Sequence, residues 1–345
     1  MKENTKKGFK IFRNIVLIIL TVLVLVILGA IYFVKTKIDK VNNVEINKEE
    51  VGVSEEVEEN LQEYRNIAIF GIDSRKTDSY ERGNRSDCII IASLNNKTKE
   101  VKLTSVYRDT YLQIDGVGLD KATHAYSYGT EELALKMLNK NLDLNIKEYV
   151  TVNFDAVVEA IDLLGGITLN IESDEELNYL NGYIGETSKV TGKSNQKLTH
   201  TGRQTVNGVQ AVAYSRIRYT SGGDYKRTER MRNVIIAMAD KLKTKNIIEL
   251  NKLIDLVLPK VHTNISQKEI ITLIPTVFNM KITESIGWPY DTRGANLGRY
   301  YGIPVTLESN VIQLHKDLFD EMEYIPTEQV KEISNKIINK TGYNK

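Results

Sequence analysis

The 345-residue sequence has a single cysteine, Cys88, which excludes an intramolecular disulfide and a cysteine-based zinc cluster. It has little net charge, because 46 lysines and arginines face 45 aspartates and glutamates, giving +1 at pH 7. This balance excludes a generally basic nucleic-acid-binding protein and an acidic tail protein. Proline is also scarce, and all five prolines lie from Pro259 onward. The 41% of hydrophobic residues exclude a disordered chain, and the length allows one large domain or two small ones.

One long hydrophobic run is present near the N-terminus. Residues 15–34 contain no charged side chain, and twenty helical residues at about 1.5 Å each span the ~30 Å core of a bilayer. The alternative, a cleaved signal peptide, has a shorter apolar region of about 7–15 residues that ends in a small-x-small site. Here Gly29 and Ala30 are followed by bulky residues, which favours an uncleaved anchor. The excess of basic residues before the run predicts a single-pass protein of the cell membrane with a cytoplasmic N-terminus and an extracellular body.

The remaining chain divides by composition. We expect residues 1–14 to be a cytoplasmic stub and residues 35–64, with eight glutamates, to be a polar stalk, which is either a solvated helix or, as we favour, a flexible spacer. We expect one catalytic domain over residues 65–325 and a C-terminal tail over 326–345. There is no internal repeat and no low-complexity tract.

From residue 66 onward, short apolar runs alternate with helical patterns. The runs predict strands at Asn66–Ile72, Cys88–Leu94, Val101–Val106, Tyr149–Val152 and Ile167–Ile171. The helical patterns lie at Glu131–Leu142, Asp155–Leu164, Arg227–Lys243, Ile247–Val257, Gln267–Phe278 and Ser309–Phe319. This order predicts an α/β (α-β-α) fold with a central mixed β-sheet flanked by helices.

Arginine and lysine are distributed unevenly. Eleven of the 14 arginines lie within 65–85, at Arg108 and within 203–232, and these stretches hold only two of the 32 lysines. A guanidinium binds phosphate or carboxylate through two parallel hydrogen bonds and stays charged when desolvated, whereas lysine is a point charge. We therefore favour an anion-binding site over the alternative of structural ion pairs. In an extended segment, Arg216 and Arg218 would point to one side.

Two aspartates accompany these arginines. Asp73 follows the first predicted strand, and Asp87 precedes the second. If the two strands are antiparallel, both carboxylates can meet at one sheet edge. Carboxylates together with phosphate oxygens and water suit Mg²⁺. With the arginines they form a candidate site for phosphoryl transfer.

Other motifs are weaker. The run from Thr191 to Ser194 reads TGKS but lacks the spacing and the preceding strand of a phosphate-binding loop, so we interpret it as a surface loop. The four histidines have no metal-ligand spacing, and no serine lies in a Gly-x-Ser-x-Gly elbow. His124 either lines a site or is a hydrogen-bonded structural histidine.

A series of blocks between residues 66 and 233 resembles the LytR–CpsA–Psr family. In order they are NIAIFGIDSR, RSDCIIIASLNNKTKEVKLTSVYRDTYL, DKATHAYSYG, VTVNF, LLGGITLNI, LNG, VQAVAYSRIR and GDYKRTERMRN. An N-terminal span followed by a stalk is also this family's layout. The resemblance implies a membrane-anchored transferase of Gram-positive envelopes. Its partners would be the lipid bilayer, a glycopolymer such as teichoic acid or capsule on a polyprenyl-pyrophosphate carrier, and the peptidoglycan acceptor, with no nucleic acid.

The resemblance also implies residue roles. Asp73 and Asp87 match the acidic pair that holds the divalent metal, Mg (or Mn), and together with Arg108 they match the catalytic residues. The residues matching the pyrophosphate-binding set are Arg85, Arg108, Arg216, Arg218 and Arg227. Arg75 and Asp109 lie in matching blocks as supporting residues. The family's prenyl tail lies in an apolar channel between sheet and helices. One departure is Tyr107, which stands where a proline commonly precedes the Arg-Asp pair.

The implied reaction is phosphoryl transfer: a peptidoglycan hydroxyl displaces prenyl phosphate and leaves the polymer joined through a phosphodiester. Two alternatives stay open, a polyprenyl-pyrophosphate pyrophosphatase and a non-catalytic membrane-anchored module that binds lipid pyrophosphate. A cytoplasmic stub of fourteen residues is too small for a DNA-binding domain.

Overall fold

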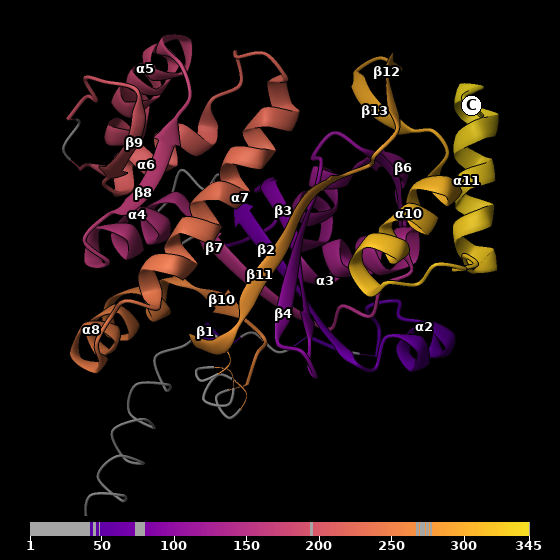
Figure 1. The fold of residues 1–345 in the computed structure, drawn as a ribbon. Coiled ribbons are helices and arrows are strands. Elements are labelled where there is room, and N and C mark those ends of the chain that lie inside the picture. Colours follow the sequence, from indigo (N-terminus) through magenta and orange to yellow (C-terminus); the bar gives the residue numbers. More distant parts are fainter. Residues whose placement is uncertain are drawn as a thin grey trace, which may run out of the picture. The chain divides into compact units, whose positions relative to one another are not determined.

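A seven-stranded mixed β-sheet is the centre of the fold in this computed structural model (Figure 1). The structure describes residues 42–43, 46–47, 49–72, 80–193, 196–266 and 278–344, with 269, 273 and 276 between the last two ranges. The sheet order is β1-β10-β7-β2-β3-β4-β11. Its strands are β1 (Asn42–Asn43), β10 (His262–Thr263), β7 (Glu148–Asn153), β2 (Tyr64–Ile72), β3 (Ser86–Asn95), β4 (Glu100–Val106) and β11 (Lys281–Trp288). The predicted mixed sheet is confirmed.

Strand directions place the ends of β2 and β3 together. β2 pairs with β3 in antiparallel fashion, and β3 pairs with β4 in the same way, whereas β2–β7 and β4–β11 are parallel. The last paired residues at this end are Ile72 and Ser86. The antiparallel arrangement required for a meeting of Asp73 and Asp87 is therefore present. Asp73 itself lies outside the described residues.

Helices cover both faces of the sheet, as Figure 1 shows. The helices are α2 (Glu55–Asn60), α3 (Ala122–Leu142), α4 (Phe154–Leu163), α5 (Asp174–Thr191), α6 (Gly208–Arg216), α7 (Gly223–Leu242), α8 (Ile247–Val257), α10 (Leu307–Phe319) and α11 (Glu328–Thr341), with a 3₁₀ turn, η1 (Leu258–Lys260). Alternate residues of β3 serve the two faces, because Ile89 and Ile91 pack into the core with α3 and α10, whereas Ile90 packs with Met231 of α7. The predicted α-β-α layering is thus observed.

Three two-stranded sheets lie outside the central sheet. They are β5 (Tyr111–Ile114) with β6 (Gly118–Lys121), β8 (Ile167–Ile171) with β9 (Gly202–Val206), and β12 (Thr292–Asn296) with β13 (Tyr300–Pro304). Of these strands only β8 is predicted from the sequence. The antiparallel pair β8–β9, which α5 connects, packs with α4, α5 and α6 around a second hydrophobic core.

The folded domain includes segments that the sequence predicts as a stalk and a C-terminal tail. Val51, Val57 and Leu61, inside the expected stalk 35–64, are buried in the main core. Ser54 caps α2 by accepting a hydrogen bond from the Val57 amide, and three of the glutamates that suggest a linker, Glu55, Glu56 and Glu59, lie on the exposed face of this amphipathic helix. In the expected tail 326–345, α11 buries three aliphatic side chains in the same core.

The predicted stub 1–14 and membrane span 15–34 lie outside the described residues. Among the residues that the structure describes, no helix is both long and apolar enough to cross a bilayer. Most of the predicted helix Gln267–Phe278 also lies outside them.

Candidate functional site

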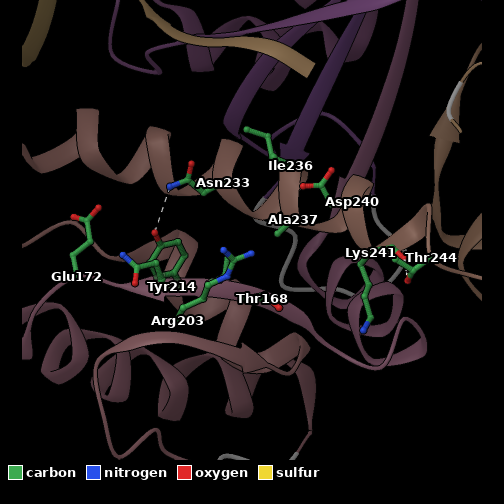
Figure 2. A pocket seen from close by; sticks show the side chains of 12 residues that line it. Thr168, Glu172, Arg203, Tyr214, Asn233, Ile236, Ala237, Asp240, Lys241 and Thr244 are labelled. Atoms are coloured by element: carbon green, nitrogen blue, oxygen red, sulfur yellow. Dashed lines mark hydrogen bonds between the residues drawn. The ribbon is translucent and has the colours of Figure 1, made fainter. Parts of the chain in front are cut away.

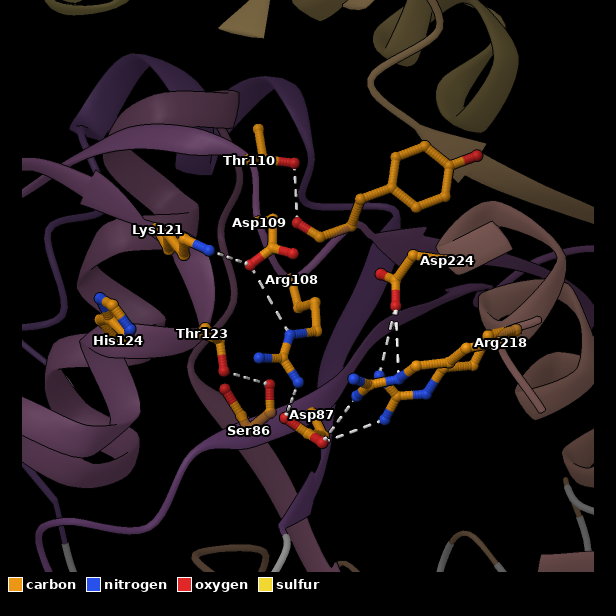
Figure 3. Close-up of polar contacts among 12 residues, drawn as sticks. Ser86, Asp87, Arg108, Asp109, Thr110, Lys121, Thr123, His124, Arg218 and Asp224 are labelled. Carbon is orange, nitrogen blue, oxygen red and sulfur yellow. Dashed lines mark hydrogen bonds and ion pairs between the residues drawn. The ribbon is translucent and has the colours of Figure 1, made fainter. Parts of the chain in front are cut away.

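Three arginines converge on the carboxylate of Asp87, the second residue of β3 (Figure 3). Arg108 pairs with Oδ1 of Asp87 through Nη1. The Nη2 atoms of Arg227 and Arg218 lie 3.1 and 3.4 Å from Oδ2. The structure thus brings together four residues that the sequence separates by up to 140 positions.

Each arginine reaches Asp87 from a different element. Arg108 follows β4, which is the neighbour of β3 in the sheet. Arg218 follows the C-terminus of α6, and Arg227 lies in the first turns of α7. Because α7 packs against β3 and β4 through Met231, its N-terminal turns lie over the end of β3 where Asp87 is found.

Two further carboxylates extend this charge cluster. Asp224 lies 3.3 Å from Nη1 of Arg227 and 3.9 Å from Nε of Arg218. Asp109 lies 2.8 Å from Nζ of Lys121 and 3.7 Å from Nε of Arg108. Figure 3 shows Lys121 on one side of Asp87 and Asp224 with Arg218 on the other. Positive and negative groups therefore alternate across the site.

Burial differs sharply among these arginines. The side chain of Arg227 is 3% exposed and that of Arg218 is 41% exposed. Burial, together with the charge of Arg227, lowers the pKa of Arg218, although a guanidinium stays charged at any physiological pH. Nε of Arg227 is buried and has no hydrogen-bond partner among the described residues. A buried donor without a partner is unfavourable, and a phosphate oxygen would satisfy it.

A pocket of about 540 Å³ opens beside this cluster. Its lining residues include Asp87, Arg216, Arg218, Arg227 and Phe154, together with three tyrosines. Arg216 does not lie in the extended segment that we expected, because it is the last residue of α6. Its Nη1 donates to Oγ1 of Thr187 at 3.0 Å, and its guanidinium lies 5.4 Å from the ring centroid of Phe154. It nevertheless reaches the same pocket as Arg218.

An apolar cavity of about 240 Å³ adjoins the same site. It lies between β2, β3 and β7 on one side and α4, α6 and α7 on the other, and Phe154 lines both it and the larger pocket. Cys88, the residue after Asp87, also lines it. Burial raises the pKa of the Cys88 thiol to about 12, so the thiol is protonated at neutral pH. The expected apolar space between sheet and helices is therefore present next to the charged site.

The structure does not add the remaining predicted site residues to this cluster in the same way, because some are not described and others lie elsewhere. Asp73 and Arg75 lie outside the described residues. Arg85 is exposed, and within the described part of the chain its side chain forms no ion pair. His124 is buried, and its Nδ1 lies 2.9 Å from Oδ2 of Asp120, which agrees with the structural alternative for this histidine.

Some clustered arginines serve structural ion pairs instead. Nε of Arg65 lies 2.6 Å from Glu148. Arg230 and Glu176 form a fully buried pair at 2.6 Å, and Arg230 also donates to the Ile217 carbonyl and the Thr220 hydroxyl. Arg230 therefore fixes the segment that carries Arg218.

A second polar pocket, of about 400 Å³, lies between the β8–β9 strand pair and α7 (Figure 2). Arg203 and Lys241 line it, and Figure 2 shows Arg203 beside Tyr214, with Lys241 near Thr244 on the other side of the pocket. Arg203 is exposed, and none of the residues that contact Asp87 lines this pocket. Arg203 thus belongs to the sequence cluster but not to the site.

Sequence reasoning missed three contributors to the site: Lys121, Asp224 and Arg230. Asp224 and Arg230 lie within the GDYKRTERMRN block, so that block contained the signal for them. Lys121 likewise lies within the DKATHAYSYG block, although it ends a short β-strand whose half-buried residues show no alternating pattern.

The donor set around Asp87 sets limits on metal binding. No group of three histidine, cysteine, aspartate or glutamate side chains suited to a metal exists among the described residues. The described part of the site thus offers no cage made of protein atoms alone. Mg²⁺ usually binds through one or two carboxylates and completes its shell with water and substrate phosphate. The Asp87 carboxylate fits this second mode, provided that the arginines bind the phosphate oxygens.

Comparisons with known proteins agree on one family. The model of the LytR_cpsA_psr family matches residues 30–308. TagT of Bacillus subtilis (strain 168), a polyisoprenyl-teichoic acid–peptidoglycan teichoic acid transferase, is 30% identical over 233 residues, which cover 66% of this chain and 69% of TagT. TagU of Enterococcus faecalis (strain ATCC 700802 / V583), which carries the same description, is 34% identical over 249 residues, which cover 70% and 74%.

Solved structures of TagT share the fold. The crystal structure of B. subtilis TagT has a TM-score of 0.55 at 25% identity and covers 82% of this chain and 92% of that chain. A TagT structure with bound octaprenyl pyrophosphate lipid has a TM-score of 0.53 at 24% identity, with the same coverage.

Proposed function

The chain belongs to the LytR–CpsA–Psr family, and from this premise we propose that it transfers a glycopolymer from a polyprenyl-pyrophosphate carrier onto peptidoglycan. The relatives TagT and TagU are named as transferases of teichoic acid to peptidoglycan. The observation that carries the proposal is the adjacency of an arginine-lined pocket and an apolar cavity at Asp87. In an amphiphile, a pyrophosphate head binds to arginines and a hydrocarbon tail binds in an apolar cavity, so such a ligand matches both spaces.

The two spaces divide the donor between them. Arg216, Arg218 and Arg227 would bind the pyrophosphate in the larger pocket, and the first part of the prenyl chain would enter the apolar cavity past Phe154. One solved TagT structure contains octaprenyl pyrophosphate lipid, and TagT is 30% identical to this chain over the matched region. These findings support the same division here.

The reaction is a displacement at phosphorus. A peptidoglycan hydroxyl forms a new P–O bond to the phosphate that carries the polymer, the P–O bond to prenyl phosphate breaks, and prenyl phosphate leaves with the electron pair. Arg108, Arg218 and Arg227 would stabilise the charge that grows on the leaving group. The hydroxyl proton passes to a carboxylate of the site, for which we propose Asp73. The product is a phosphodiester.

We further propose that a divalent cation, Mg (or Mn), binds with the donor. Asp87 and Asp73 would hold it, and the cation would supply additional neutralisation of the pyrophosphate. The arginines that contact Asp87 would then turn to the phosphate oxygens, for which their planar forks are suited.

The cellular location is a further part of the proposal. The relatives are named for a polyisoprenyl-linked substrate, and a polyprenyl chain partitions into a bilayer, so we propose a single-pass anchor at residues 15–34 with the catalytic domain outside a Gram-positive cell.

The test uses the full-length chain in liposomes with a lipid-linked donor, Mg²⁺ and peptidoglycan fragments, followed by mass spectrometry of the products. We expect Asp87→Ala and Arg108→Ala each to lower transfer by about 10²–10³-fold. Arg203→Ala is the matched control, because Arg203 is exposed and lies in the other pocket, so its transfer rate should not change.

Two results would contradict the proposal. Phosphate release at equal rates with and without peptidoglycan indicates a pyrophosphatase. Donor binding without any turnover in Mg²⁺, and without any change on chelation by EDTA, indicates a non-catalytic binding module.

A further inference from the structure

Two tyrosines stand next to the site in the chain and contact each other in space. Tyr107 directly precedes Arg108, and Tyr225 directly follows Asp224. Their rings meet edge to face, with centroids 4.5 Å apart and planes inclined by 80°. Tyr107 is half-buried, whereas Tyr225 is 43% exposed. The half-buried Tyr107 ring thus packs against the Tyr225 ring. The Tyr225 ring is exposed to solvent next to Asp224 of the charge cluster.

The β12–β13 hairpin continues this aromatic surface. A side-chain hydrogen bond joins Tyr225 to Thr292 of β12, and the charge of Tyr300 on β13 also affects the pKa of Tyr225. Tyr300 is 54% exposed and lies across Gly294, where a Cβ atom would come within 2.9 Å of its ring. Tyr225 and Tyr300 therefore present two exposed rings that neighbouring residues hold in place. We call these two rings the tyrosine surface.

The hairpin is fixed to the site through backbone contacts. The Gly302 amide of β13 donates to the Asp109 carbonyl at 2.9 Å, and Thr110 forms a β-bridge with Gly302. The segment after Arg108 and the hairpin therefore move as one unit. The tyrosine surface has a fixed position relative to Arg108.

The tyrosine surface and the proposed donor pocket share the N-terminal turns of α7 but otherwise use different elements. The donor pocket is lined by α5, the end of α6, residues 217–219, Phe154, Asp87 and Arg227 of α7, and the apolar cavity by α4, α6, α7 and the sheet. The tyrosine surface comes from Tyr225 in the first turn of α7 and Tyr300 in the β12–β13 hairpin. In Figure 1 the hairpin lies on the opposite side of α7 from α5. Neither tyrosine lines the donor pocket or the apolar cavity.

We propose that Tyr225 and Tyr300 bind the sugar rings of the acceptor glycan, an inference that rests on the proposed transfer reaction. In an in-line displacement the attacking hydroxyl approaches opposite the leaving group, and the apolar cavity places the leaving prenyl phosphate on the far side of the cluster. A tyrosine offers an apolar ring face and a polar hydroxyl. An N-acetylated hexose has a matching apolar ring face and a polar rim.

The test measures acceptor and donor separately with the full-length chain in liposomes. The acceptor probe is a soluble peptidoglycan tetrasaccharide of N-acetylated sugars. We expect the pair Tyr225→Ala with Tyr300→Ala to raise the acceptor KM roughly tenfold, with the donor KM and kcat within about twofold of wild type. Tyr300→Ala alone isolates the surface, since Tyr300 does not pack on Tyr107. Tyr300→Phe, which keeps the ring, should restore the acceptor KM.

The control is Tyr290→Ala. Tyr290 is also exposed, but its hydroxyl interacts with Asp317, away from the tyrosine surface, so both KM values should stay unchanged. Sedimentation with insoluble peptidoglycan gives a second readout that needs no turnover. There the wild type should sediment and the double variant should stay in solution.

The outcomes separate this inference from the proposed function. If wild-type protein transfers no polymer but sediments with peptidoglycan through the two tyrosines, the proposed function fails and the binding surface stands. If the double variant changes only the donor KM, the surface binds the donor glycan and the inference is wrong. Unchanged kinetics with unchanged sedimentation also overturn it.

Discussion

Replacing Arg227 with lysine keeps the positive charge at the centre of the site but removes the planar fork. Arg227 contacts Asp87 through Nη2 at 3.1 Å and Asp224 through Nη1 at 3.3 Å. A lysine has one ammonium group on a flexible chain, and at this position it can keep only one of the two contacts at good geometry. The substitution therefore tests whether the site needs guanidinium geometry or only charge.

The magnitude follows from burial. Because the side chain of Arg227 is only 3% exposed, water replaces a lost partner there less readily than at an exposed arginine. One hydrogen bond to a charged group is worth about 1.5–3 kcal/mol, which corresponds to about 10- to 150-fold in an equilibrium constant. We expect Arg227→Lys to weaken pyrophosphate binding and kcat/KM for transfer within this range.

Arg218→Lys is the matched comparison, because Arg218 also contacts Asp87. Its side chain is 41% exposed, and its contacts to Asp87 and Asp224 are longer, at 3.4 and 3.9 Å. Exposed ion pairs contribute only about 0.2–1 kcal/mol, so lysine here should lower affinity about fivefold at most.

The assay is calorimetric titration of the full-length chain with inorganic pyrophosphate at low and high salt, together with transfer kinetics. The effect at position 218 should shrink as salt screens the exposed charge, whereas the effect at 227 should persist. Equal losses at both positions would show that the number of charges decides binding. If Arg227→Lys changed pyrophosphate affinity and kcat/KM by less than twofold, the argument from burial and guanidinium geometry would be refuted.

Three further predictions concern stability and accessibility. Glu176→Gln should lower the free energy of unfolding by about 3–5 kcal/mol because it leaves a buried guanidinium uncompensated, whereas the exposed Glu175→Gln should change it by less than ~0.5 kcal/mol; urea unfolding measures both. Cys88, with its pKa raised to about 12, should react with iodoacetamide at pH 8 roughly a thousandfold more slowly in the folded than in the unfolded chain, and prenyl pyrophosphate should slow it further. Gly287→Ala should cost about 1–3 kcal/mol, because its Cβ would lie 2.1 Å from the Tyr107 hydroxyl; a loss of equal size in the Tyr107→Ala background would contradict this cause.

The fold was predictable where local pattern and burial agree. The runs that became β2, β3 and β4 are apolar because both faces of these strands are covered, and such runs are visible without any partner. β11 was not predicted, because it is an edge strand with half of its residues exposed and its place comes from pairing with β4. Helix α5 was missed although Ser173 caps it and three acidic residues follow, a recognisable start signal.

The sequence predicts that the site is rich in arginine, but it does not predict which of the arginines belong to the site. Arginine enrichment indicates a need for guanidinium groups, and three of the enriched arginines do meet at Asp87. The same enrichment includes Arg230, which pairs with Glu176 from a helix more than fifty residues away. The packing of α6 against α5 and α7 decides which of these arginines faces the pocket and which pairs with Glu176. The local spacing of the arginines in the sequence does not encode this packing.

Tyr107 shows how a departure from the family pattern can be accommodated by packing. A proline at this position would stiffen the segment before Arg108 by restricting φ. Here the Tyr107 amide donates to the Trp288 carbonyl, a bond that proline cannot form, and its ring packs against Tyr225 while Gly287 leaves room for its hydroxyl. These contacts tie the Arg108 segment to β11 and to the first turn of α7, which carries Asp224 and Arg227. Tertiary contacts thus replace a local constraint, and they couple the arginine from the sheet to the arginine from the helix. For this reason, loosening Tyr107 should disturb both partners of Asp87 together, whereas a proline would stiffen only the segment before Arg108.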